Sequence, residues 1–211
     1  MNRTFLILLM IGAAMLIAVI GQDRPVNDLN YLPWEVNRLD NGSLRVFGIT
    51  LGKTTIQEAN QIYASFAKTR LQDITSANDT HSHQLIAIYD ELSTGGLLGK
   101  IQLGYQLDPE VLAEIVKTAN VSSEDQVDQK NTKLYAIDNK TEIELLNTPV
   151  SSITYIPAID FGEDVIRQRF GQAAEELIIN EDKQLWFYPE LGLQVYIYTN
   201  ELDRFVYSPL K

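Results

Sequence analysis

The 211-residue sequence contains no cysteine. This absence excludes disulfide bonds, a thiolate nucleophile, zinc–thiolate sites and lipid attachment through an N-terminal cysteine. Histidine is also scarce, because His81 and His83 are the only two. A Ser–His–acid triad would have to use one of them, and no serine lies in a Gly-x-Ser-x-Gly motif. The composition therefore argues against most nucleophilic hydrolases.

Positive charge is the second shortage. Lys and Arg together number 17 against 28 Asp and Glu, which gives a formal net charge of −11. Such a surface repels phosphate groups and anionic lipid heads. We therefore expect no nucleic-acid binding and no peripheral attachment to anionic membranes, and the acidity itself favours solubility.

Long apolar runs are absent except at the start of the chain, where Thr4 to Ile20 follows Arg3 without a charge or proline. As a helix this run would be about 25 Å long, the short end of what spans a bilayer. Residues 1–21 are therefore predicted to be an uncleaved single-pass anchor in the inner (plasma) membrane. A cleaved signal peptide ending at Val19-Ile20-Gly21 is the alternative. The positive-inside tendency places the body in the periplasm or elsewhere outside the cytoplasm.

The composition of residues 22–42 is that of a linker, and the first predicted helix begins near Thr54. Its capping box pairs Thr54 with Gln57, or Thr55 with Glu58. Alternating apolar residues, turn signals and helical spacing predict further elements along the chain. These are strands at 85–89, 101–105, 134–137, 152–156, 185–188, 193–199 and 204–207, and helices at 108–119 and 160–170.

The order helix then hairpin occurs twice, on either side of the polar segment 121–131. Leu51-Gly52 enters the first helix and Phe161-Gly162 the second, at matching distances from Ile56 and Ile166. We therefore predict an α+β protein with two helix-plus-antiparallel-sheet units, 43–121 and 132–211, as a tandem repeat. Each unit alone would bury little, whereas two could cover each other.

Two segments carry a resemblance. The segment from Phe47 to Ala59 resembles the helix entry of the SmpA/OmlA (BamE-like) envelope proteins, and Phe170-Gly171-Gln172-Ala173 followed by Trp186-Phe187-Tyr188 resembles a later part of that family. Ala173 stands where the family usually has proline. A tandem of such units is also similar to the fold of the beta-lactamase inhibitor protein. The resemblance implies helices packed on an antiparallel sheet and a non-catalytic, protein-binding role.

Several groups of side chains were considered for chemistry. His81 and His83 lack further spaced metal ligands, so we predict an exposed loop, no metal site and no cofactor. Gly95 to Lys100 departs from the phosphate-loop pattern and is predicted to be a hairpin turn. The remaining candidates are carboxylates, which capping and solvation explain. They are Glu175 with Glu176, Asp125 with Asp128, and Asp160 with Glu163 and Asp164.

The C-terminal aromatic residues are the best candidates for a site. Because side chains alternate along a strand, Tyr196 and Tyr198 are predicted to lie on the opposite face of their strand from Val195. Trp186 and Tyr188 likewise lie on the opposite face of their strand from the residues next to them. If the aliphatic face packs on a helix, the four aromatic side chains gather on the other face. Trp and Tyr are enriched at binding hot spots. The alternative is that the other unit covers them as a second core.

These features together predict a non-enzymatic, membrane-anchored envelope protein that binds another envelope protein. The alternatives are an envelope hydrolase that uses a carboxylate pair, which two acids facing each other in an open groove would favour, and a carrier of a small apolar ligand or lipid.

Overall fold

The computed structural model describes residues 31–75, 81–119, 124–129 and 132–209. These residues form a ten-stranded antiparallel sheet, a three-stranded sheet and four α-helices, which confirms the expected mixture of helices and antiparallel sheet. The elements are β1 (Asn37–Arg38), β2 (Leu44–Val46), β3 (Ile49–Thr50), α2 (Ile56–Ile62), β4 (Lys68–Thr75), β5 (His81–Thr94), β6 (Leu97–Tyr105), α3 (Pro109–Thr118), β7 (Glu124–Gln129), β8 (Thr132–Ala136), α4 (Asn139–Glu144), β9 (Val150–Pro157), α5 (Glu163–Phe170), β10 (Glu175–Asn180), β11 (Lys183–Tyr188), the 3-10 turn η1 (Pro189–Leu191), β12 (Leu193–Tyr198) and β13 (Arg204–Tyr207).

Within the described residues, no helix combines the length and apolar character needed to cross a bilayer. The anchor or signal peptide predicted for residues 1–21, and the first part of the predicted linker, lie outside the described residues.

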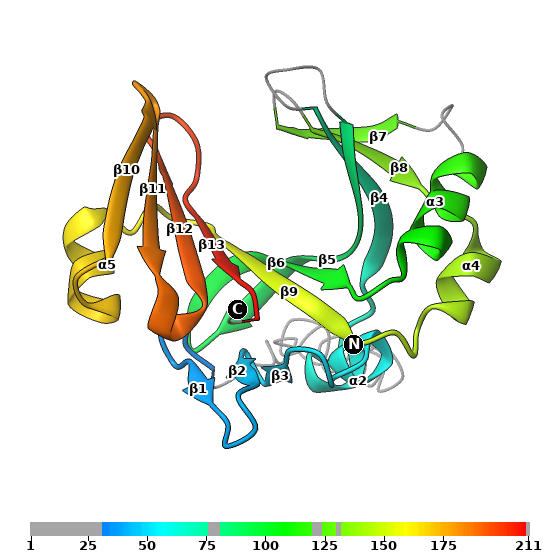
Figure 1. The fold of residues 1–211 in the computed structure, drawn as a ribbon, viewed down its shortest axis with the longest axis horizontal. Helices are drawn as coiled ribbons and strands as arrows, with labels where there is room; N and C mark the ends of the chain where they lie inside the picture. Colours follow the sequence, from blue (N-terminus) through cyan, green and yellow to red (C-terminus); the bar gives the residue numbers. More distant parts are fainter. Residues whose placement is uncertain (1–30, 76–80, 120–123, 130–131, 210–211) are drawn as a thin grey trace, which may run out of the picture.

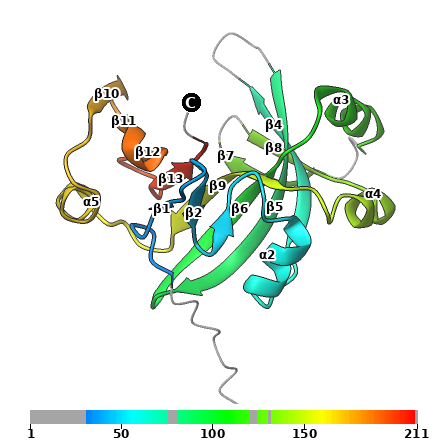
Figure 2. The ribbon, with the colours of Figure 1, turned by 60° about the horizontal axis from the view of Figure 1, so that its bottom comes forward.

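The large sheet is strongly curved. Its strand order is β10-β11-β12-β13-β9-β6-β5-β4-β8-β7. In Figure 1 the two ends of the sheet rise as arms, and the middle strands β9, β6 and β5 connect them below. The helix α5 lies outside one arm, α3 and α4 lie outside the other, and α2 lies below with the small sheet (Figures 1 and 2). The described helices therefore lie on the outer, convex side of the sheet.

Strand register assigns side chains to the two faces. One row across the pleat runs from Trp186 through Val195, Phe205 and Tyr155 to Ile101. These side chains belong to the core cluster that includes Ile56 of α2, Ile115 of α3 and Ile166 of α5, so we call this side the outer face. The neighbouring row, Leu185, Tyr196 and Arg204, points to the opposite side, which we call the inner face.

A single core cluster extends along the outer face through both halves of the chain. The sheet also crosses the predicted boundary near residues 122–131, because β8 pairs with β4 and β9 pairs with β6. The division into units 43–121 and 132–211 stays a prediction.

Local signals explain several element ends. Thr55 caps α2, accepting from the Glu58 backbone N–H at 3.2 Å, while its own N–H donates to the Glu58 carboxylate at 2.8 Å. This is one of the two capping boxes predicted from the sequence. Gly95 and Gly96 have positive φ values and form the turn between β5 and β6, as predicted. Asp160 does not cap α5; its carboxylate accepts from the N–H of Gly162, which is the N-cap residue.

Several elements were not predicted, and β4, β7, α4 and β10 are the longest of them. The strand β4 has buried polar residues such as Thr69 and Gln72, which interrupt the apolar alternation. The strand β10 is exposed along its whole length, so it lacks a buried side that would reveal it. Backbone pairing in the assembled sheet, rather than side-chain pattern, defines these strands.

Gly99 in β6 permits close packing against Tyr155. A Cβ at this position would lie 2.4 Å from the Tyr155 ring and 2.8 Å from the Ile156 carbonyl oxygen. Tyr155 is fully buried, and its ring contacts Phe47 and Phe205. The ring therefore has little room to move.

We predict that Gly99→Ala lowers the free energy of unfolding by about 1–3 kcal/mol through overpacking. Urea denaturation measures this change. Leu98→Ala, at an exposed neighbouring position, is the control and should change stability by less than about 0.5 kcal/mol. Equal midpoints for both variants would contradict the packing argument.

Candidate functional site

The four aromatic residues predicted as a binding surface lie on two different faces. Trp186 pairs with Val195, whereas Leu185 pairs with Tyr196. Trp186 and Tyr188 therefore share the outer face with the aliphatic residues of β12, and Tyr196 and Tyr198 lie on the inner face. The structure does not bring all four together. The sequence pattern gives the alternation within each strand but not the register between strands.

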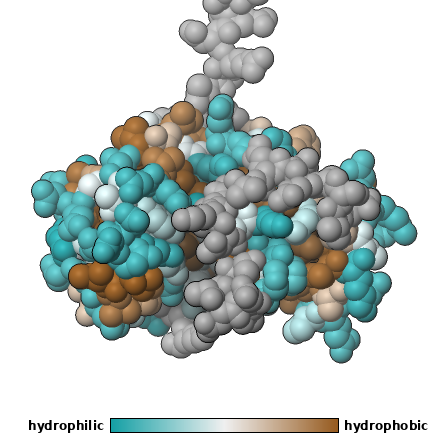
Figure 3. Space-filling model, turned by 90° about the horizontal axis from the view of Figure 1, so that it is seen from above, coloured by the Kyte–Doolittle hydropathy of each residue, from teal (hydrophilic) through white to brown (hydrophobic). Residues whose placement is uncertain are grey.

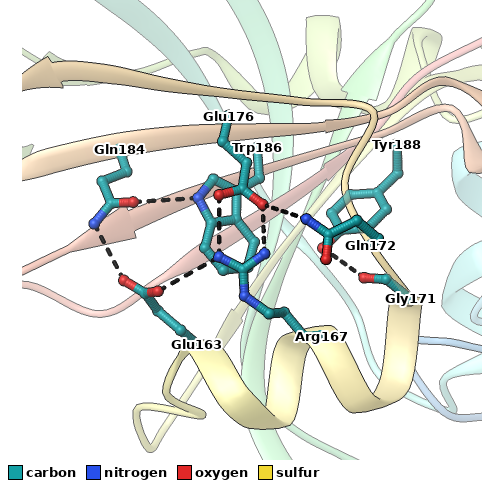
Figure 4. Close-up of polar contacts among 8 residues, drawn as sticks. All are labelled: Glu163, Arg167, Gly171, Gln172, Glu176, Gln184, Trp186 and Tyr188. Atoms are coloured by element: carbon teal, nitrogen blue, oxygen red, sulfur yellow. Dashed lines mark hydrogen bonds and ion pairs between the residues drawn. The ribbon is translucent and has the colours of Figure 1, made fainter.

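Trp186 is a core residue with 0% exposure. The Arg167 guanidinium of α5 lies 4.0 Å above the centre of its ring, and the indole N–H donates to the Gln184 side chain at 3.2 Å (Figure 4). Arg167 also forms a bidentate pair with Glu176 of β10, one bond of which is 3.0 Å. These contacts fasten α5 to the outer face of β10 and β11.

Electrostatics follow this geometry. The hydrogen bond with Arg167 lowers the pKa of Glu176, and the same bond raises the pKa of Arg167. Both groups therefore stay charged, which keeps the guanidinium over the indole ring as a cation–π contact.

Tyr188 holds the C-terminal end of α5. Its hydroxyl donates to the Gly171 carbonyl oxygen at 3.3 Å, and its ring lies 6.0 Å from that of Phe170. Burial raises the pKa of its hydroxyl. Trp186 and Tyr188 thus position a helix rather than a partner.

This assignment predicts that substitutions on the two faces lower the free energy of unfolding by different amounts. Trp186→Ala should lower the free energy of unfolding by about 3–5 kcal/mol because it empties a packed site. Tyr198→Ala, on the inner face, should cost less than about 1 kcal/mol. Urea denaturation of the two variants compares them directly, and equal costs would mean that both rings are packed alike.

The inner face presents Tyr196 and Tyr198 between two cations. The Lys183 ammonium lies 4.6 Å from the Tyr196 ring centre and 5.3 Å from that of Tyr198, and the Arg204 guanidinium lies 5.9 Å from that of Tyr198. All four residues are half-buried. We call this group the tyrosine–cation cluster.

The cluster is held by its neighbours. The Tyr196 hydroxyl donates to the Gln194 side chain at 3.2 Å, and burial raises its pKa. Cation–π contacts of this kind contribute about 0.5–1 kcal/mol at exposed sites. The rings therefore keep a fixed orientation while part of their surface remains accessible, which suits recognition of another molecule.

Other cations recur along the inner face, although the chain is strongly acidic. Lys68 and Lys100 lie there, and both contact Asp90, at 2.8 Å and 3.7 Å. The hydrogen bond from Lys68 is the main reason that the pKa of Asp90 is lowered. Ile86, Ile88 and Leu134 form a small apolar cluster on the same face, and all three side chains are buried. The inner face thus combines cationic, aromatic and aliphatic groups.

The predicted carboxylate pairs do not form a cleft in the described residues. Glu175 and Glu176 point to opposite faces of β10, and the side chains of Asp125 and Asp128 lie outside the described residues. Asp160 and Glu163 instead lie near Asp203, a residue not predicted from the sequence. Three grooves lined by described residues have volumes of about 700, 500 and 350 Å³, and none of these three is lined by these acids.

Asp203 is fully buried in the turn between β12 and β13, where its carboxylate accepts from the Tyr198 backbone N–H at 3.1 Å. Burial raises its pKa to about 7, and Asp160 and Glu163 act in the same direction. The backbone hydrogen bond only partly offsets them. The second carboxylate oxygen of Asp203, Oδ2, is buried without a hydrogen-bond partner.

A raised pKa means that the folded chain holds a proton which the unfolded chain releases. The contribution of Asp203 is thus fully present below about pH 3.8, and stability is lost as the pH rises towards 7. We predict that Asp203→Asn raises the free energy of unfolding above that of wild type by about 1–3 kcal/mol at pH 8. The increase should be smaller at pH 5. Denaturation curves at both pH values measure this, and a gain independent of pH would contradict it.

The two histidines considered for a metal site lie at the start of β5. His81 and His83 belong to β5 rather than to a loop, and the Nδ1 atom of His81 lies 3.0 Å from a carboxylate oxygen of Asp73. Across the described ranges, no group of three or more His, Asp or Glu side chains could hold a metal ion.

Comparisons of the chain with protein families, with curated proteins and with solved structures found no match. The relation to SmpA/OmlA proteins and to the beta-lactamase inhibitor protein therefore stays a hypothesis that rests on the residues quoted above.

Proposed function

We propose that this protein is a non-enzymatic envelope protein, anchored in the inner membrane by its apolar start, that binds another envelope protein through the inner face of its sheet. The apolar run at Thr4 to Ile20 and the preceding Arg3 support an extracytoplasmic body. The cysteine-free, acidic composition is compatible with that compartment.

One observation carries the proposal. The large sheet packs its outer face against helices, and no described helix lies on its inner face (Figure 1). A sheet with both faces dedicated to folding would be covered on both sides. Here the concave side instead presents the tyrosine–cation cluster, whose tyrosine and arginine residues are of types enriched at protein–protein hot spots.

The chemistry of the inner face indicates what it would bind. Towards the other arm, Lys68 and Lys100 are already paired with Asp90. At the cluster, Lys183 and Arg204 flank the two tyrosines. A complementary surface would place carboxylates against these cations and an apolar group against the rings. We therefore expect a protein partner with an acidic, partly apolar protruding segment.

The element order supports the tandem interpretation within this proposal. In each half a helix is followed by consecutive antiparallel strands: α2 precedes β4, β5 and β6, and α5 precedes β10, β11 and β12. Two such units joined edge to edge through β6, β9 and β13 would produce one curved sheet. A duplicated unit is thus a simple route to a concave binding face.

Photocrosslinking in intact membranes tests the proposal. A benzophenone amino acid at position 196 or 198 should capture a discrete protein, whereas one at position 66 should not. Phe66 is a matched control because it is aromatic and 90% exposed but lies outside the sheet.

With the captured protein purified, Tyr196→Ala and Tyr198→Ala should each weaken binding by about 10- to 100-fold, a loss of about 1–3 kcal/mol. Phe66→Ala should leave the affinity unchanged, and all three variants should stay folded, with thermal midpoints within about 4 °C of wild type. Unchanged affinity in both tyrosine variants would exclude the cluster as the contact.

A further inference from the structure

The strand β10 is the last strand at one end of the large sheet. Among the described residues it pairs only with β11, and every one of its six residues is exposed. Its centre is aliphatic: Leu177, Ile178 and Ile179 are 39%, 82% and 50% exposed. Figure 3 shows apolar groups exposed on the left of the molecule, the side where Figure 1 places β10.

Sheet proteins usually protect such an edge with lysine, proline, a bulge or a covering element, because unpaired backbone groups attract another strand. In β10 the only such feature is a register irregularity between Ile178 and Asn180. The two acids, Glu175 and Glu176, lie at one end, and Glu176 is already paired with Arg167. The middle of the edge is left uncharged.

The aliphatic side chains project from both faces of the strand. Leu177 pairs with Leu185 and so faces inward, whereas Ile178 pairs with Gln184 and faces outward. A flat apolar surface such as a membrane would contact one face only. A strand added to the edge would cover both faces and pair the free backbone groups as well.

Charge selects the orientation in which a second copy of β10 can pair. In an antiparallel pair the two-fold axis is perpendicular to the sheet, so side chains of the same face meet. If two copies pair about Leu177, then Leu177 lies opposite Leu177, and Glu176 lies opposite Ile178. No carboxylate then faces another carboxylate. A parallel pair in register would instead place Glu175 against Glu175, which is unfavourable.

We propose that two copies of this chain associate by antiparallel pairing of β10 with β10, centred on Leu177. The arrangement is closed and two-fold symmetric, the commonest form of self-association in proteins. It joins two curved sheets into one and leaves both inner faces free. It therefore does not depend on the function proposed for the inner face.

The absence of cysteine makes a direct test possible. In the full-length chain, in mild detergent, Leu177→Cys introduces the only thiol. Mild oxidation should link two copies at least about ten-fold faster than for Ile143→Cys, because an antiparallel pair holds the two Cβ atoms within disulfide reach. Ile143 is a matched control, an aliphatic residue 67% exposed on α4 in the opposite arm.

A second variant separates pairing from folding. Leu177→Lys places two ammonium groups opposite each other, so sedimentation should show a dimer for wild type and a monomer for this variant at roughly 10–100 µM. At a concentration low enough for wild type to be monomeric as well, Leu177→Lys should have the same circular dichroism spectrum and thermal midpoint as wild type. Ile143→Lys should remain dimeric.

Three results would overturn the proposal. These are a wild-type chain that stays monomeric over this range, a dimer that persists in Leu177→Lys, and crosslinking at position 143 as fast as at 177. Capture of a different polypeptide by Leu177→Cys in membranes, with no self-linked product, would likewise assign the edge to another protein.

Discussion

The structure depends on packing one side of a long antiparallel sheet against helices. Trp186, Tyr155 and Ile101 lie in one row of the outer face, and the helices bury them together. Because a pleated strand alternates its side chains, burying this row fixes which residues point inward. The composition of the inner face is therefore a consequence of how the core is built.

The contact between Arg167, Trp186 and Glu176 shows how the helix α5 packs on the sheet arm that contains β10 and β11. A helix, a buried aromatic ring and an exposed strand meet through one guanidinium, which lies over the ring and pairs with the carboxylate. This contact ties the outer face of β10 to α5, and β11 pairs with one edge of the strand. Within the described ranges the other edge of β10 has no strand partner, so it is available for pairing outside the molecule.

The inner face and the β10 edge are different kinds of surface. The inner face offers oriented rings and cations, which recognise shape and charge. The edge offers backbone groups and short aliphatic side chains, which recognise an extended strand. Two copies paired through β10 would present two concave faces, so self-association would multiply binding sites without using them.

The sequence by itself determined the class of fold, most strand and helix positions, the capping box at Thr55 and the turn at Gly95 and Gly96, because each depends on neighbours in the chain. It also determined the apolar start and the exclusion of thiol chemistry. Only the tertiary structure decided the partition of Trp186 and Tyr188 from Tyr196 and Tyr198, the burial of Asp203 and the existence of β10. The physical reason is that register, burial and edge pairing are relations between distant segments, and periodicity within one strand carries no information about them.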